Sequence, residues 1–322
     1  MPRVERIRRA SWRRRCVCAV LGSIMLWGLA GCQSLFYYPS QRRFFTPEMF
    51  GDPHENVWIT TADGARLHGW MVKAKAPAPR GIVLFFHGNA HNISHYYLAV
   101  KGFVEAGYHL LTFDYRGYGL SEGVPSPEGL LLDAQAVWEF LQQRPEFAPG
   151  KVVILGQSLG GAVALDWIGR TRPEGIGLVI SESAFSSYEA IVEEKLNPLG
   201  IVRIFRKPLA SGLFDDEHAP IRHVARVSPT PLLIVHGTHD TTVSYAHAQA
   251  LFNASSSPKL LWTIEGGGHI SMLTRHGSEY WGRLLLLMDQ LLLDDTPDPT
   301  WTLRPGVRAG GVHLDRLAIR AH

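Results

Sequence analysis

Cysteine is scarce in this chain of 322 residues, and all of it lies near the N-terminus. The three cysteines are Cys16, Cys18 and Cys32, so the remaining sequence contains no thiol. The chain after Cys32 can therefore form neither an internal disulfide nor a cysteine-ligated metal site. Hydrophobic residues make up 46% of the sequence, which is ample for a packed core without a disulfide framework.

The chain from Cys32 onward also has no excess of positive charge. The whole sequence has 32 basic and 29 acidic residues, but seven arginines and one glutamate precede Cys32. Without that segment the count becomes 25 basic and 28 acidic residues, a net charge of −3. A slightly acidic body gives no support for nucleic-acid binding, so we expect no nucleic-acid partner.

The first 31 residues have the features of a targeting segment. Arginines are spread over residues 3–15, and residues 16–29 form an apolar stretch too short to span a bilayer comfortably. The stretch ends in Leu29-Ala30-Gly31-Cys32, which resembles the lipobox of bacterial lipoproteins. The resemblance implies a signal peptide over residues 1–31, cleavage before Cys32 and acyl chains on that residue. An uncleaved N-terminal membrane anchor is the alternative interpretation.

The same resemblance predicts a location. A lipidated Cys32 would anchor the protein to a membrane of the bacterial cell envelope, facing outside the cytoplasm. Gln33 follows the cysteine, which in a host with two membranes resembles the pattern for sorting to the outer membrane. Residues 32–55 are rich in aromatic side chains and are predicted to be a linker between anchor and domain. Their rings would lie at the membrane interface or pack on the domain edge.

Strand-like and helix-like stretches alternate through the rest of the chain. Two β-rich stretches around Asp63-Gly64 predict a hairpin. Further strands are predicted at residues 81–86, 108–113, 152–155, 177–183, 232–235 and 259–264. Helices are predicted at residues 94–106, 245–253 and 278–293. Two more are predicted, one that begins at Ser126 and one that follows the turn at residues 156–160 and ends at about residue 172.

This alternation predicts an α/β fold with a mostly parallel twisted sheet and helices on both faces. We expect this domain to span residues 56–295. Short helices over about residues 184–227 would form a small cap over the strand ends. Residues 296–322 lack periodicity and are predicted to be a disordered tail.

The stretch Gly156-Gln157-Ser158-Leu159-Gly160 follows a predicted strand and opens a predicted helix. This context is typical of a nucleophile elbow, in which a serine stands on a sharp turn. Side chains at the two flanking glycines would collide with the neighbouring strand and helix. The alternative is a glycine-rich turn that contains an incidental serine.

A serine hydroxyl is a weak nucleophile and needs a base that is oriented by a carboxylate. His269 and Asp240 each follow a predicted strand, as Ser158 does. In parallel sheets the carboxyl ends of the strands meet at one edge, which is where sites form. The sequence therefore predicts that these three side chains come together.

Several stretches together resemble the α/β-hydrolase family over about residues 57–293. They are His87-Gly88-Asn89, Asp114-Tyr115-Arg116-Gly117-Tyr118-Gly119-Leu120-Ser121, Gly156-Gln157-Ser158-Leu159-Gly160, His236-Gly237-Thr238-His239-Asp240 and Gly268-His269. The branch that looks most similar is serine aminopeptidase-like or lysophospholipase-like, and it includes membrane-associated depalmitoylases.

The resemblance implies a role for each residue of the site. Ser158 would be the nucleophile, His269 the base and Asp240 the acid, in the family's chain order. The backbone N–H of Leu159 and that of Asn89 or Ala90 would form the oxyanion hole. Gly88 suits this loop because a side chain there would obstruct the carbonyl group. No cofactor is implied.

Competing residues exist for the acid and for the base. Glu182 ends the strand after the elbow helix, where some family members carry the acid. His87 and His236 are expected to make structural hydrogen bonds, and Asp114 to act structurally. The spacing His236-x-x-His239-Asp240 could indicate a metal, but a loop without a second cluster is a weak basis, so no metal is predicted.

We therefore expect a serine hydrolase that cleaves carboxylic esters or thioesters of hydrophobic acyl groups. A peptidase or amidase of the serine aminopeptidase type is the alternative enzyme, and a non-catalytic envelope lipoprotein is the alternative outside enzymes. The predicted cap is apolar, and its basic residues would either meet an anionic head group or lie in solvent. These residues are Lys195, Arg203, Arg206 and Lys207.

Overall fold

The computed structural model describes residues 36–196, 202–214, 216–274 and 277–292. The predicted signal peptide, the lipidation site Cys32 and the predicted tail lie outside the described residues. Within the described ranges, none of the helices combines the length and apolar character that crossing a bilayer requires.

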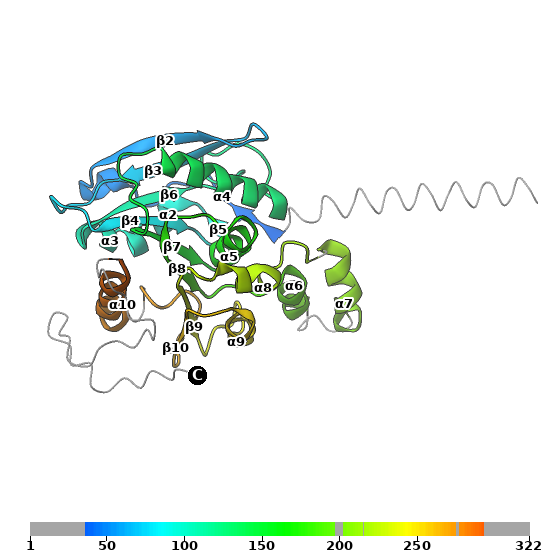
Figure 1. Cartoon of the computed structure of the whole chain (residues 1–322). Coiled ribbons are helices and arrows are strands. Elements are labelled where there is room, and N and C mark those ends of the chain that lie inside the picture. The colour runs from blue at the N-terminus through cyan, green and yellow to red at the C-terminus, as the bar shows by residue number, and fades with distance from the viewer. Residues whose placement is uncertain (1–35, 197–201, 215, 275–276, 293–322) are drawn as a thin grey trace, which may run out of the picture.

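A twisted eight-stranded sheet runs through the domain in the order β10-β9-β8-β7-β4-β6-β3-β2 (Figure 1). The hairpin strands β2 and β3 are antiparallel, β3 also pairs antiparallel with β6, and all other neighbours are parallel. The strand bounds are β2 His54–Thr60, β3 Arg66–Val72, β4 Gly81–Phe86, β6 Tyr108–Phe113, β7 Val152–Gln157, β8 Ile176–Glu182, β9 Leu232–Gly237 and β10 Lys259–Ile264. The predicted hairpin and parallel strands are thus confirmed.

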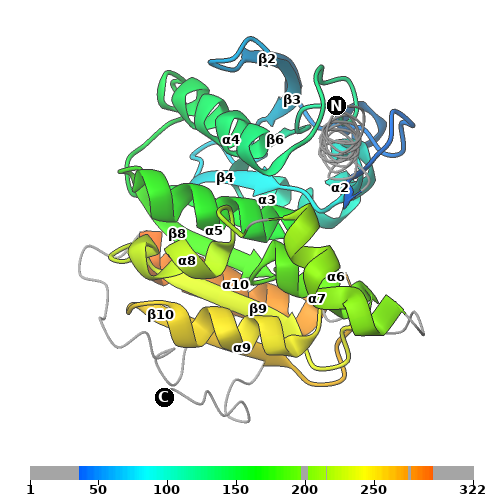
Figure 2. The same cartoon turned by 90° about the vertical axis from the view of Figure 1, so that its right-hand side faces the viewer.

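Helices cover both faces of this sheet (Figures 1 and 2). Helices α4, α5 and α9 pack on one face, whereas α2, α3 and α10 contribute side chains to the core on the other. The helix bounds are α2 Ile93–Val100, α3 Gly102–Glu105, α4 Pro127–Gln142, α5 Leu159–Thr171, α6 Tyr188–Leu196, α7 Val202–Leu213, α8 Pro220–His223, α9 Tyr245–Ala254 and α10 Gly277–Leu292. Because both faces are covered, every residue of β4, β7 and β9 is buried.

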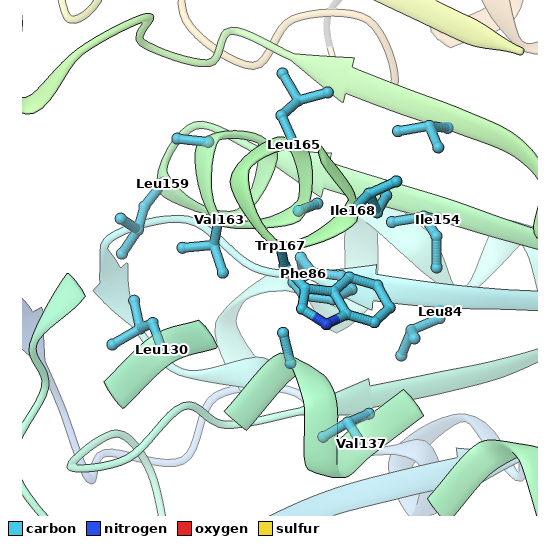
Figure 3. Close-up of a cluster of buried hydrophobic side chains, with 14 of the residues drawn as sticks. Leu84, Phe86, Leu130, Val137, Ile154, Leu159, Val163, Leu165, Trp167 and Ile168 are labelled. Carbon is cyan, nitrogen blue, oxygen red and sulfur yellow. The ribbon is translucent and has the colours of Figure 1, made fainter. Parts of the chain in front are cut away.

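Helix α5 lies at the centre of the larger core, where it packs against the sheet and against the neighbouring helix α4 (Figure 3). Its Trp167 ring stacks on Phe86 of β4 at 6.2 Å between centroids and meets Trp138 of α4 at 5.8 Å. Helix α4 begins as predicted, because the Ser126 side chain accepts a hydrogen bond from the Gly129 N–H. The contacts of Trp167 with β4 and α4 therefore hold α5 in place on the sheet.

One local prediction differs from the structure. The helix expected over residues 94–106 is two helices, α2 and α3, that separate at Lys101. Gly102 weakens helix propensity there, and its Cα faces the indole of Trp281 on α10, so tertiary packing decides the break.

Aromatic side chains of the predicted linker pack on the domain, the second of the two arrangements expected for them. Tyr37 is buried, and the two-residue strand β1 (Tyr38–Pro39) pairs in parallel with β5 (Ala90–His91). The 3-10 helix η2 (Pro47–Phe50) follows. Phe50 packs against Tyr97 of α2 with 6.0 Å between ring centroids.

The predicted cap consists of α6, α7, α8 and the 3-10 helix η3 (Val224–Val227). Helices α6 and α7 pack against each other and lie near residue 36, where the described chain begins (Figure 2). Lys195 of α6 donates a 3.4 Å hydrogen bond to the carbonyl oxygen of Thr241, beyond β9. The cap thereby contacts the loop that carries Asp240.

Candidate active site

Ser158 stands between β7 and α5 on a strained turn, with φ 54° and ψ −116°. A non-glycine residue rarely adopts this backbone conformation, and such strain gathers at functional sites. A Cβ on Gly156 would lie 2.6 Å from the carbonyl oxygen of Gly160, and one on Gly160 would overlap the carbonyl oxygen of Phe86. The elbow therefore requires both glycines for close packing against helix and strand, as the sequence predicts.

Asp240 and His269 form the tightest polar contact of the site. The Nδ1 atom of His269 lies 2.7 Å from Oδ2 of Asp240, and the carboxylate is buried. The other oxygen, Oδ1, accepts hydrogen bonds from the N–H groups of Thr242 at 2.8 Å and Val243 at 2.9 Å. His236 adds a further contact, with Nε2 at 3.2 Å from Oδ2.

These contacts keep Asp240 ionised. Burial alone would raise its pKa, but hydrogen bonds from His236, His269 and the Val243 N–H outweigh burial and hold the pKa well below the usual range. A charged carboxylate at Nδ1 fixes the tautomer and the orientation of the His269 ring.

An apolar pocket of about 590 Å³ opens where the strands end. Ser158 and His269 both line it, and Leu159 and Asn89 lie on the same wall. Most of the remaining lining is apolar and comes from the cap, from the segment before β2, from β5 and α2, and from the loops after β9 and β10. These residues are Phe36, Tyr38, Ala90, Tyr96, Phe185, Ile191, Val192, Lys195, Leu196, Leu213, Phe214, Thr242, Val243 and Ile270. The structure thus brings the predicted site residues to one cavity, except the acid Asp240, which reaches it through His269.

Two backbone N–H groups belong to residues that line the same pocket as Ser158. Leu159 is the first residue of α5, so its N–H has no acceptor within the helix. The N–H of Asn89 has no acceptor among the residues that the structure describes. Both residues line the pocket, as an oxyanion hole would require.

Glu182 lies behind the site at the end of β8. Its Oε1 accepts a 2.7 Å hydrogen bond from the Met272 N–H, and its Oε2 accepts one of 2.8 Å from the Gln157 side chain. Burial raises the pKa of this carboxyl, although the hydrogen bonds from Gln157 and Met272 oppose the change. Within the described residues Glu182 makes no hydrogen bond to His269, so its geometry is that of a support for the loop after Gly268.

Other polar residues singled out in the sequence serve the framework. His87 is fully buried, with Nδ1 at 2.7 Å from the Gly88 carbonyl, and burial lowers its pKa. His236 Nε2 lies 2.8 Å from the Val243 carbonyl. Asp114 accepts a 2.8 Å hydrogen bond from the Ile93 N–H at the start of α2. Among the described residues, no cluster of histidine, cysteine and carboxylate side chains could hold a metal ion.

The structure adds a second reason for the glycine at position 88. A Cβ on Gly88 would meet the hydroxyl group of Tyr96 at 2.5 Å, so Gly88 is needed to leave room for Tyr96. Tyr96 itself lines the pocket and has no local sequence pattern that predicts this.

Three further residues of the site were not identified from the sequence. Thr242 and Val243 hold Asp240 through their backbone, an arrangement that Asp240-Thr241-Thr242 could have indicated because aspartate favours such turns. Phe36 lines the pocket from the segment predicted to be a linker, and only its long-range contacts identify it.

Comparison with known proteins agrees with this architecture. A family model described as serine aminopeptidase, S33, matches residues 77–212. The protein YfhR of Escherichia coli K12 is 36% identical over 251 residues, which cover 77% of this chain and 84% of YfhR. The α/β-hydrolase domain-containing protein WAV2 of Arabidopsis thaliana is 28% identical over 260 residues, 76% of this chain and 82% of WAV2. The chain belongs to the α/β-hydrolase family.

A solved structure shares the fold. The esterase Pf2001 of Pyrococcus furiosus superimposes with a TM-score of 0.65, covering 79% of this chain and 99% of that chain at 20% sequence identity. At this identity the likeness concerns the fold, and it confirms the α/β-hydrolase architecture with a mostly parallel sheet.

Proposed function

We propose that the protein is a serine hydrolase that cleaves carboxylic ester or thioester bonds of hydrophobic acyl substrates. One observation carries the proposal: Ser158 on a strained elbow and His269, paired with buried Asp240, line the same apolar pocket. A protein that only binds has no need for a strained serine beside such a pair.

The proposed reaction begins with attack of the Ser158 hydroxyl oxygen on the acyl carbonyl carbon. Nδ1 of His269 is engaged by Asp240, so Nε2 is the nitrogen that would take the serine proton. The N–H groups of Leu159 and Asn89 would stabilise the oxyanion. His269 then protonates the leaving alcohol or thiol as its bond to the acyl carbon breaks. A water molecule, deprotonated by His269, hydrolyses the acyl-serine.

The pocket supports an apolar acyl group. Its wall beyond Ser158 is built from the cap residues Ile191, Val192, Leu213 and Phe214. No aspartate or glutamate is among the described residues that line it, so nothing there would pair with the free α-amine of a peptide. This lining favours esters over the aminopeptidase alternative.

We also propose that the reaction takes place at a membrane of the cell envelope. The predicted lipidation site Cys32 precedes Phe36 by four residues, and four extended residues reach at most about 14 Å. Acyl chains on Cys32 would therefore keep the pocket close to the bilayer, where acyl lipids are concentrated. Labelled palmitate incorporation that is lost in Cys32→Ala would support this, and unlabelled parent protein would contradict it.

A chain-length series tests the substrate class. The full chain, in detergent, would be given p-nitrophenyl esters and matching thioesters from acetyl to dodecanoyl, beside peptide p-nitroanilides. We expect kcat/KM to rise with acyl length and to exceed that for the anilides. Ser158→Ala and His269→Ala should each lose at least about 10³-fold in kcat. Rates that are flat or falling beyond short chains would reject the acyl pocket.

A further inference from the structure

The chain segment of residues 36–42, which we call the strap, runs along the loop that carries Asn89. Strand β1 in the strap pairs with β5, directly after Asn89, and the Ser40 N–H donates a 3.2 Å hydrogen bond to the His91 carbonyl. The Asn92 side chain donates hydrogen bonds of 2.6 and 2.8 Å to the carbonyl oxygens of Ser40 and Arg42. Hydrogen bonds therefore join the strap to this loop at several positions, although the two are about 50 residues apart in sequence.

Asn89 itself is held from two sides. Its side-chain Nδ2 donates a 2.6 Å hydrogen bond to the carbonyl oxygen of Phe36 in the strap. The hydroxyl group of Tyr118 donates to Asn89, lying 2.8 Å from Oδ1 and 2.9 Å from the backbone carbonyl oxygen. The Tyr38 N–H also approaches that carbonyl at 3.4 Å. These bonds fix the side chain and backbone of Asn89 while leaving its own N–H without an acceptor among the described residues.

The strap also reaches the cap. The Phe36 ring lies 6.0 Å from Phe185, 5.5 Å from Tyr188 and 5.4 Å from Phe214, measured between ring centroids. Phe36 therefore joins three aromatic rings of the cap region by its side chain and Asn89 by its carbonyl oxygen. One residue connects the wall of the acyl pocket to the loop beside Ser158.

We propose that the strap is a positioning element of the active site, which aims the Asn89 N–H at the oxyanion through the Asn89 side chain. This inference rests on the proposed function. An oxyanion donor contributes only when its N–H points at the developing charge, so orientation of the Asn89 peptide plane is decisive. The hydrogen bonds to Phe36 and from Tyr118 restrain that plane. In this proposal the backbone N–H of Asn89 donates to the oxyanion, and the side chain of Asn89 determines the direction of that N–H.

Asn89→Ala tests the inference because it deletes both side-chain hydrogen bonds and retains the backbone N–H. In the full chain we expect kcat for a butyryl ester to fall about 10- to 100-fold, since a small misplacement of one donor costs this much. KM should stay within about threefold, because the apolar cap side chains that would hold the acyl group are unchanged. Affinity for an alkylboronic acid, which forms a tetrahedral adduct on serine, should fall by the same factor as kcat.

A matched control separates positioning from general stability. Asn56→Ala removes an asparagine whose Oδ1 accepts from the side chains of His68 and Trp70 on the far hairpin. It should leave kcat and boronate affinity unchanged. If Asn89→Ala does not fold, Tyr118→Phe removes one of the same restraints and should lower kcat and boronate affinity together, by a smaller factor.

The possible results are distinct. A fall in kcat and boronate affinity at constant KM supports the positioning role. An unchanged kcat, or a rise in KM alone, overturns it, because Asn89 would then be structural or part of the pocket wall. If instead the parent protein hydrolyses no ester and Ser158→Ala equals the parent, the proposed function itself has failed.

Discussion

The imidazole Nδ1 of His269 lies 2.7 Å from Oδ2 of Asp240, although helix α9 and strand β10 separate the two residues in sequence. The second carboxylate oxygen is held by the N–H groups of Thr242 and Val243, so Asp240 cannot rotate away without losing both bonds. This arrangement engages Nδ1 of His269, so Nε2 is the nitrogen that would accept the serine proton, and Asp240 is the acid of the proposed reaction.

Replacing this acid should nearly abolish turnover. Asp240→Asn keeps the shape of the side chain but favours the wrong tautomer of His269, so we expect kcat to fall on the order of 10⁴-fold. Steady-state hydrolysis of a p-nitrophenyl ester near neutral pH measures the change. A loss smaller than about tenfold would mean that another residue orients His269.

Glu182 provides the matched comparison, since it is the other carboxylate considered for this role. Glu182→Gln retains an acceptor for the Met272 N–H but replaces the oxygen that accepts from the Gln157 side chain with an NH2 group. We expect its kcat to remain within about tenfold of the parent. The reverse order, with Glu182→Gln far more damaging than Asp240→Asn, would assign the acid to Glu182.

Asp240 should also make the fold sensitive to acid. Its pKa in the folded state is below the usual range because His236, His269 and the Val243 N–H outweigh its burial. The folded protein therefore binds this proton less tightly than the unfolded chain does. The stabilisation is complete above the unfolded pKa of about 3.9 and is lost as the pH falls below it.

Urea unfolding at a series of pH values measures this effect. Between about pH 4.5 and pH 2.5, the free energy of unfolding of the parent should fall more steeply than that of Asp240→Asn. Parallel curves for the two proteins would contradict the low pKa of Asp240.

The glycines of the elbow should tolerate no side chain. Gly160→Ala places a methyl group against the backbone carbonyl of Phe86, which cannot move without shifting β4. We expect a loss of at least about 3 kcal/mol in the free energy of unfolding. Gly212→Ala in α7, where a Cβ meets nothing within 4 Å, is the control and should be neutral or slightly stabilising. Equal stabilities of the two variants in urea would contradict the tight packing of the elbow.

The acyl pocket should shorten when a large side chain is introduced into its wall. Val192→Trp adds an indole where the cap lines the pocket. We expect kcat/KM for dodecanoyl esters to fall at least about tenfold, while that for acetyl esters changes little. Leu209→Trp introduces the same group at an exposed position of α7 and should not alter the chain-length profile. Equal losses for short and long esters would argue against an acyl chain in this cavity.

Much of the fold could be predicted from the sequence because its elements have strong local patterns. The unbroken apolar stretch of β4 is typical of a strand covered on both faces, and the structure buries all of it. The elbow was predictable because its two glycines meet a steric requirement that few other residues satisfy. The chain order of Ser158, Asp240 and His269 then indicated which strand ends would meet.

The strap could not be predicted in this way. Strand β1 has only two residues, which is too short for any periodicity. Its position depends on the side chains of Asn89 and Asn92, which come about 50 residues later and have no local reason to bind it. The break at Lys101 likewise depends on Trp281, from the other end of the chain. Tertiary contacts, rather than propensity, decided both.

Covalent labelling tests the central claim most directly. The full chain would be treated with an alkyl fluorophosphonate, and the modified residue located by intact and peptide mass spectrometry. A hydrolase with Ser158 activated by His269 should gain one phosphonyl group, located on Ser158, and Ser158→Ala should gain none. A parent protein that stays unmodified, or that is modified equally in Ser158→Ala, would contradict the proposed hydrolase.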